Sequence, residues 1–226
     1  MMKKFIYMVA SLAFLTACHS NTTENKTEST QTAATTEQTT VTTQKSNGEA
    51  DLSLGIQMVV NKKHKLPADY NPGENPIAGE KVRELIQKMQ ELGFSISNQY
   101  SGFRSYEYQT QLYQNYVNKD GKKAADTYSA RPGYSEHQTG LAFDILNGTG
   151  GLLGENPQDE KAIEWLHSHA HEYGFIVRFQ EGKEAITGYQ AEAWHLRYVG
   201  DIAEQIYTSK LTLEEYFSVE GGNYAD

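Results

Sequence analysis

Residues 135–144 read SEHQTGLAFD, and the rest of the chain is organised around this stretch. It places His137 and Asp144 seven residues apart, with Gly140 between them. The apolar run Leu141–Ile145 predicts a short buried strand, and a buried carboxylate needs a cation or hydrogen-bond donors to stay ionised. A histidine that arrives through a glycine-bearing turn suggests a metal ion as that cation. Two ligands do not complete a metal site, so another part of the chain must supply a third.

The N-terminal segment has the features of an export signal. Two lysines precede the apolar run at 5–17, which is too short to span a bilayer. The run ends in LTAC at residues 15–18, and Cys18 is the only cysteine of the chain. This pattern resembles the bacterial lipobox, in which the cysteine is lipidated and becomes the mature N-terminus. We therefore expect a lipoprotein signal peptide at 1–17 and lipidation at Cys18; the alternative is an ordinary signal peptide with an incidental cysteine.

Composition divides the remainder into a linker and one domain. Residues 18–50 are rich in threonine and other polar residues and nearly free of large apolar ones, which predicts a disordered tether. The folded domain is expected at 51–226, and a single cysteine excludes a disulfide within the chain. The net charge of −9 argues against nucleic acid as a partner and against electrostatic binding to anionic lipid. Membrane attachment would then depend on the lipid, which places a monomeric domain on the extracellular face of the cell membrane.

Helical and strand patterns alternate after residue 51 without an internal repeat. The apolar spacing predicts helices at 77–92, 105–116, 157–173 and 201–209. Short apolar and aromatic runs predict strands at 56–61, 94–103, 141–145, 175–179 and 192–198, with loops at 118–132 and 182–188. The mixture lacks a regular βαβ rhythm, so we expect an α+β domain with a small, mostly antiparallel sheet flanked by helices.

The sequence EAWH at 192–195 supplies the missing ligand. His137, Asp144 and His195 would present two imidazoles and one carboxylate, a set that suits zinc and leaves a fourth position for water. Glu192, three residues before a ligand, could take a proton from that water. Residues three apart on a regular strand face opposite sides, so Glu192 must lie in a bulge or turn.

These two half-motifs carry a family resemblance. The pattern S-x-H-x-x-G-x-A-x-D at 135–144, followed by E-x-W-H at 192–195, resembles the zinc D-Ala carboxypeptidases of the VanY type. The longer segments ARPGYSEHQTG at 130–140 and WHLRY at 194–198 resemble the LD-carboxypeptidase B branch found in streptococci. The likeness extends over residues 51–217 and implies the hedgehog-like fold of zinc DD-peptidases.

The resemblance also implies roles for individual residues. Glu192 would be the general base for water and then the general acid toward the leaving D-alanine amine. Arg104, in SGFRS at 101–105, would stabilise the developing charge on the scissile carbonyl oxygen. The expected substrate contacts are Gln109 and Ser135, which would hold the peptide or its terminal carboxylate, and Trp194, which would form a wall of the pocket.

The implied activity is cell-wall remodelling by removal of the C-terminal D-alanine from peptidoglycan stem tetrapeptides. D-alanyl-D-alanine carboxypeptidase activity on pentapeptides is the first alternative, because the zinc chemistry is the same and only the pocket differs. An endopeptidase acting on cross-links with the same metal is a second alternative. A binding module that holds cell-wall peptide without turnover is a third, and the presence of Glu192 weighs against it.

Several other residues allow competing interpretations. His167 and His171 share a helical face and could form a metal pair, although a solvated face is favoured for them because HExxH is absent. Arg131 could replace Arg104 as the anion-binding group. His64 lies among lysines and is expected to be exposed. Capping, solvent contact or packing could explain the remaining candidates, Gln109, Ser135 and Trp194.

Overall fold

A computed structural model describes residues 48–225 of the chain. The expected signal peptide, Cys18 and the linker up to residue 47 lie outside the described residues. Ala50 is buried and Glu49 forms an isolated bridge with Lys65, so ordered contacts begin just before the expected boundary at residue 51. Within the described part, no helix combines the length and apolar character needed to cross a membrane.

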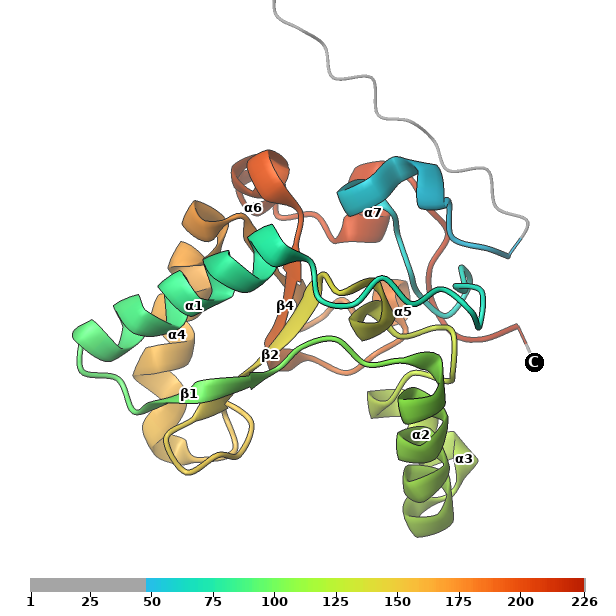
Figure 1. Cartoon of the computed structure of the whole chain (residues 1–226), viewed down its shortest axis with the longest axis horizontal. Coiled ribbons are helices and arrows are strands. Elements are labelled where there is room, and N and C mark those ends of the chain that lie inside the picture. Colours follow the sequence, from blue (N-terminus) through green and yellow to red (C-terminus); the bar gives the residue numbers. More distant parts are fainter. Residues whose placement is uncertain (1–47, 226) are drawn as a thin grey trace, which may run out of the picture. The chain divides into compact units, whose positions relative to one another are not determined.

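Four strands form one antiparallel sheet in the described residues. They are β1 (Ile96–Ser101), β2 (Ala142–Asn147), β3 (Phe175–Phe179) and β4 (Glu192–Tyr198), in the spatial order β1-β2-β4-β3. The α-helices are α1 (Pro76–Glu91), α2 (Tyr106–Asp120), α3 (Lys122–Tyr128), α4 (Glu160–His169), α5 (Glu184–Thr187), α6 (Ala203–Ser209) and α7 (Leu213–Phe217). The predicted α+β class and antiparallel sheet are confirmed (Figure 1).

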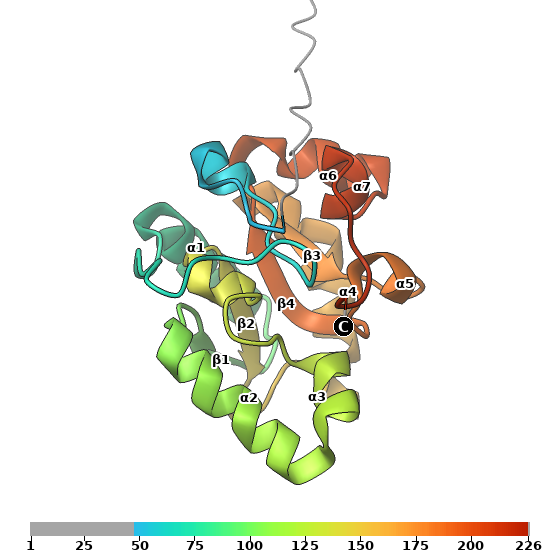
Figure 2. The same ribbon diagram turned by 90° about the vertical axis from the view of Figure 1, so that its right-hand side faces the viewer.

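The sheet has one apolar and one polar face because side chains alternate along each strand. Phe143 on β2 and Leu196 on β4 pack in one core cluster with the buried side of α1 and with α4. The intervening residues, Asp144 on β2 and His195 on β4, must therefore face the other way. The helices α2 and α3 lie next to each other at the lower end of the domain in Figures 1 and 2, near the polar face of the sheet.

The predicted strand at 56–61 is wrong. Residues Leu52–Gln57 form a 3₁₀ helix, and Asn61 makes only an isolated bridge with His64. The carbonyl oxygens of Ile56 and Met58 accept hydrogen bonds from Arg197 Nη2, at 3.0 and 2.7 Å. The side chain of Arg197 thus supplies hydrogen-bond donors that a neighbouring strand would otherwise provide. Local sequence propensity does not reveal such a contact.

Two predicted loops contain short helices. Gly121, with φ +83°, separates α2 from α3 where a loop was expected at 118–132. Similarly, α5 lies within the expected loop at 182–188. A capping box begins α7, since the side chains of Thr212 and Glu215 each bond the other's backbone.

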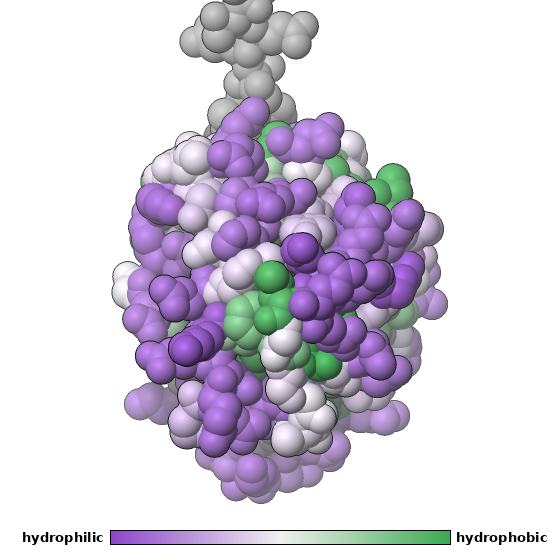
Figure 3. All heavy atoms as spheres, turned by 90° about the vertical axis from the view of Figure 1, so that its left-hand side faces the viewer, coloured by the Kyte–Doolittle hydropathy of each residue, from purple (hydrophilic) through white to green (hydrophobic). Residues whose placement is uncertain are grey.

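The outer surface near α1 gives little indication of function. Figure 3 shows the face at the left of Figure 1, where polar residues surround a small apolar area. The large apolar side chains that are at least about a third exposed in the described part are Leu52, Ile77, Leu92, Tyr108 and Leu211. Scattered apolar side chains of this kind are ordinary on protein surfaces.

Candidate active site

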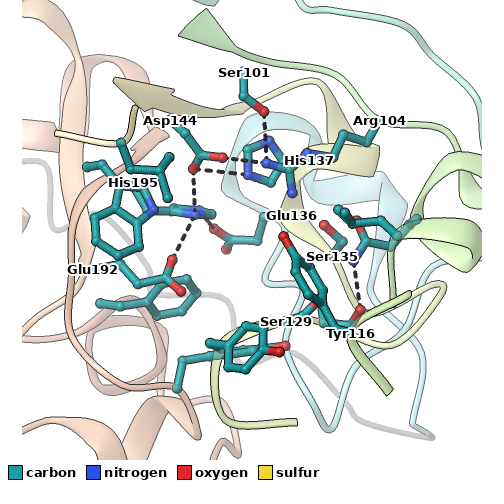
Figure 4. Close-up of a pocket in the computed structure, with 18 of the residues that line it drawn as sticks. Ser101, Arg104, Tyr116, Ser129, Ser135, Glu136, His137, Asp144, Glu192 and His195 are labelled. Atoms are coloured by element: carbon teal, nitrogen blue, oxygen red, sulfur yellow. Dashed lines mark hydrogen bonds and ion pairs between the residues drawn. The ribbon is translucent and has the colours of Figure 1, made fainter. Parts of the chain in front are cut away.

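The fold brings the three predicted ligands together on the polar face of the sheet (Figure 4). Asp144 on β2 is the direct cross-strand partner of His195 on β4, and His137 comes from the 3₁₀ turn Glu136–Thr139 that precedes β2. Asp144 Oδ1 lies 3.3 Å from His137 Nε2 and 3.3 Å from His195 Nδ1. In residues 48–225 this trio is the one group of three or more His, Cys, Asp or Glu residues with ligand spacing.

The spacing of these atoms fits a tetrahedral zinc ion. Ligand atoms about 2.0–2.1 Å from such an ion lie roughly 3.3–3.4 Å apart, which matches the separations from Asp144 Oδ1 to both imidazoles. That oxygen is buried and has no hydrogen-bond partner in the structure, and a buried polar atom of this kind needs one. The donor set and the unpaired oxygen both indicate a metal position between these three side chains.

The turn before β2 fixes the orientation of His137. Its Nδ1 lies 2.7 Å from the carbonyl oxygen of Gly102, which accepts the ring proton and leaves Nε2 free to bind a metal. Gly140 ends the turn with φ +72°, and its backbone N–H donates to the His137 carbonyl oxygen. A Cβ at this position would lie 2.0 Å from the carbonyl oxygen of Gly73. Only glycine fits, because both the dihedral angle and the close approach exclude a side chain.

Electrostatics act differently on the three ligands. Burial by itself would raise the pKa of Asp144, but the adjacent side chains of His137, His195 and Arg104 hold it well below its usual value. For His137, burial and the neighbouring guanidinium of Arg104 lower the pKa. An ionised carboxylate and a neutral imidazole are the protonation states that a metal requires, and these shifts favour them in Asp144 and His137. Burial would lower the pKa of His195, but three nearby carboxylates raise it well above its usual value, so this ligand must give up a proton when a metal binds.

Glu192 lies beside the trio because β4 is irregular, as the spacing in the sequence requires. Val177 of β3 pairs with Leu196 of β4, and Phe179 pairs with Glu192. From the first pair to the second, β3 advances by two residues while β4 moves by four, so β4 contains extra residues at this point. The irregularity turns Glu192 to the same side as His195, and its Oε2 lies 3.4 Å from His195 Nδ1. Burial raises the pKa of Glu192 against the opposing hydrogen bond from His195. A carboxylate with a raised pKa is better matched to proton transfer near neutral pH.

The residues expected to contact substrate line one cavity of about 550 Å³ around the trio: Arg104, Gln109, Ser135, Glu192 and Trp194. The Nη2 atom of Arg104 donates to Ser101 Oγ at 2.8 Å and also contacts Asp144 Oδ2. Gln109 is buried and donates to the carbonyl oxygen of Ala130, while its Oε1 has no partner. The cavity that contains the metal position is therefore also lined by a guanidinium and an unpaired amide oxygen.

The competing candidates do not assemble a second site. His167 Nε2 contacts the carbonyl oxygen of Ala193, whereas His171 pairs with Glu204 and stacks on Tyr207. Each histidine thus has its own partners.

The structure also tests the expectations for Arg131 and His64. Arg131 forms an ion pair with Asp126 and lies over the ring of Tyr224, so it does not serve as an alternative to Arg104 in the cavity. The prediction that His64 is exposed is wrong, because it is fully buried with Nδ1 3.0 Å from Asn61 Oδ1.

Sequence reasoning missed Glu136, the neighbour of a ligand. Its side chain is 2% exposed and lies between Arg178 on β3 and Arg197 on β4. Burial would raise its pKa, but the two guanidinium groups outweigh that effect and lower it. A signal was present in the chain, because FIVRF at 175–179 and WHLRY at 194–198 each place an arginine inside a strand pattern. Buried arginines of this kind require a buried anion.

Two imidazoles and one carboxylate around a single point, with a buried glutamate beside them, define the metal centre of a zinc-dependent hydrolase. Residues 73–201 match the model of VanY, D-alanyl-D-alanine carboxypeptidase, and the chain belongs to this family.

Individual relatives agree with this assignment. A D-alanyl-D-alanine carboxypeptidase of Enterococcus faecalis is 32% identical over 197 residues, covering 79% of this chain and 70% of that protein. The crystal structure of an L,D-carboxypeptidase, DacB of Streptococcus pneumoniae, matches with a TM-score of 0.71 and 61% identity, covering 74% of this chain and 89% of the other. A VanY D,D-pentapeptidase variant in complex with Zn(II) matches with a TM-score of 0.60 and 31% identity, covering 71% and 97%. The protein is thus a zinc-dependent carboxypeptidase of peptidoglycan peptides.

Proposed function

We propose that this protein is an LD-carboxypeptidase that removes the C-terminal D-alanine from peptidoglycan stem tetrapeptides. The observation that carries the proposal is the 61% identity to the L,D-carboxypeptidase DacB, against 31% to the D,D-pentapeptidase. Removal of D-alanine from either peptide would use the same zinc chemistry in this site, so the specificity must come from the remainder of the pocket. The higher identity to DacB extends over most of the domain that forms this pocket.

The proposed roles follow from the geometry of the cavity. His137, Asp144 and His195 hold zinc, which, when bound, polarises the scissile carbonyl group and makes water a stronger nucleophile. Glu192 takes the proton from the attacking water at its carboxylate and delivers it to the departing amine of D-alanine. The buried setting that raises the pKa of Glu192 favours this exchange in both directions.

Arg104 and the polar groups of the cavity complete the proposed mechanism. The guanidinium of Arg104 is 19% exposed and can move from Asp144 toward an oxygen that gains negative charge on the substrate. The unpaired Oε1 of Gln109 accepts an N–H from the peptide. Ser135 and Trp194 also line the cavity and contact the peptide. Together these groups hold the scissile carbonyl between the metal position and a cation.

The location completes the proposal. A signal peptide at 1–17 directs the chain out of the cell, a lipid on Cys18 anchors it, and the polar segment 18–50 separates the domain from the membrane. A flexible chain of that length has a root-mean-square span of about 30 Å. The domain acts as a monomer on the outer face of the membrane, within reach of the cell wall. The support for this part is the LTAC sequence at 15–18 and the lack of any other cysteine.

A defined mixture of muropeptides tests the activity. Wild-type protein should release D-alanine from tetrapeptides, as followed by mass spectrometry, and a chelator should abolish the release. Glu192→Gln keeps the size of the side chain but cannot take the proton, so the rate should fall by about 10²–10⁴-fold. Glu164→Gln, an exposed change on α4, is the matched control and should leave the rate unchanged.

D-alanyl-D-alanine carboxypeptidase activity on pentapeptides is the second candidate, because the family description and the Enterococcus faecalis relative both name it. Release of D-alanine only from the pentapeptide in the same mixture would overturn the LD assignment. Full activity of Glu192→Gln would contradict its role as the base while leaving peptide binding open. Cleavage of cross-linked peptides without a free carboxylate would instead indicate an endopeptidase.

A further inference from the structure

A buried cluster of charged groups lies against the nitrogen of His195 that does not face the metal position. Its Nδ1 faces Asp144 Oδ1, and its Nε2 faces Glu136 Oε2 at 3.5 Å. We propose that Glu136 is a positioning residue: it accepts the Nε2 proton of His195 and so keeps the Nδ1 lone pair directed at zinc. The proposal depends on the zinc site and is independent of which peptide is cleaved.

The two facing atoms have no other partners. His195 Nε2 and Glu136 Oε2 are both buried and make no hydrogen bond to any other group in the structure. Unpaired buried polar atoms are costly, and a ring N–H opposite a carboxylate oxygen satisfies both at once. A proton on Nε2 leaves Nδ1 unprotonated, which is the form that a metal ligand must have.

The other oxygen of Glu136 is held in place by two arginines. Glu136 Oε1 accepts from Arg178 Nε and from Arg197 Nη1, each at 2.8 Å, and both guanidinium groups are fully buried. Two such bonds keep the carboxylate ionised and fix its plane, so that Oε2 has one direction available. In Figure 4 the carboxylate of Glu136 lies below and to the right of His195, on the side away from Asp144.

The arginines are in turn held by parts of the chain outside the family match at 73–201. Arg178 forms a two-bond pair with Glu214 on α7, at 2.6 and 2.8 Å. Arg197 Nη2 donates to the backbone carbonyls of Ile56 and Met58. The two arginines therefore link Glu136 to the segment before α1 and to α7, and Glu136 alone of these groups faces the imidazole.

Two variants separate the proposed role from a general effect on stability. Glu136→Gln removes the charged acceptor from His195, whereas Glu214→Gln removes the same charge from the same arginine without touching the imidazole. Zinc affinity, measured by competition with a chromophoric chelator, should fall about 10–100-fold in E136Q. It should stay within about threefold of wild type in E214Q, even if the melting temperature of E214Q falls further. Equal losses in the two variants, or an unchanged affinity in E136Q, would overturn the proposal.

A measurement on the wild-type protein does not depend on any variant folding. Nitrogen-15 NMR of the zinc-loaded protein, with labelled histidine, should show the His195 proton on Nε2, in slow exchange with water. A proton on Nδ1, or no proton on Nε2, would refute the assignment. Should E136Q be too unstable to purify, Glu136→Asp replaces it, since it retains the charge between the arginines but shortens the reach to His195. Its zinc affinity should also fall, and wild-type affinity in E136D would count against the proposal.

Discussion

Replacing Gly140 with alanine tests whether the turn between His137 and Asp144 is essential for the site. Gly140 has φ +72°, and an added Cβ would lie 2.0 Å from the carbonyl oxygen of Gly73 and 3.0 Å from the backbone nitrogen of Asn75. Both neighbours are backbone atoms, so the clash is not relieved by rotation of a side chain. The turn itself must move, and with it the two ligands that it connects.

The expected loss in the free energy of unfolding of Gly140→Ala has two parts. The left-handed conformation costs a residue with a Cβ about 1–2 kcal/mol, and forcing an atom into a packed site costs about 1–3 kcal/mol more. Gly93 provides the control, because it has φ +86° and open space where a Cβ would be added. Gly93→Ala should therefore show only the first cost. We expect Gly140→Ala to lower the free energy of unfolding by about 2–5 kcal/mol, against about 1–2 kcal/mol for Gly93→Ala.

Thermal denaturation of the two variants in parallel measures the difference. For a domain of this size, 1 kcal/mol corresponds to a shift of roughly 2–4 °C in the melting temperature. Zinc affinity should fall in G140A and remain at the wild-type value in G93A, because Gly93 is at the far end of α1. Equal destabilisation by the two substitutions would show that the contact with Gly73 is relieved at no cost. The claim that this turn fixes the ligands would then be wrong.

Two further predictions concern Arg104 and Lys62. Arg104→Met should lower kcat/KM by about 10²–10³-fold because it removes the cation expected to face the scissile carbonyl oxygen; Arg83→Met, an exposed change, is the control, and a loss below tenfold would refute the role. Burial lowers the pKa of Lys62 to about 8 against the opposing charge of Asp126, whereas the unfolded chain keeps that proton up to about 10.5. Since the unfolded state then binds more protons, the free energy of unfolding of wild type relative to Lys62→Met should rise between pH 8 and 10. Chemical denaturation across that range measures it, and a flat difference would contradict the lowered pKa.

The sequence contained most of the site because its key residues lie in short motifs. His137 and Asp144 are joined by a single turn, and Glu192 and His195 lie three residues apart. The irregularity in β4 could be inferred in advance, since a regular strand would direct those two side chains to opposite faces. Helices such as α1, with regular apolar spacing, were predictable for the same reason, because the pattern that specifies them is local.

The strand expected at 56–61 shows where local reasoning fails. Its residues have the composition of a strand, yet their carbonyl groups bond to Arg197, about 140 residues further along the chain. The burial of His64 also involves a distant part of the chain, because Asn61, which contacts the imidazole, donates a hydrogen bond to Glu214 on α7. Neither contact can be predicted from the residues next to it in the sequence.

By itself, the sequence determined which side chains could bind zinc and which acid could move a proton, because residue type and spacing are local properties. Tertiary structure decided that Asp144 and His195 are cross-strand partners with 3.3 Å between their ligand atoms. It also decided that Glu136 lies behind His195 between two buried arginines. The physical reason is that a buried charge is tolerated only where its counter-charges converge, and those counter-charges come from strands that meet only in the folded domain.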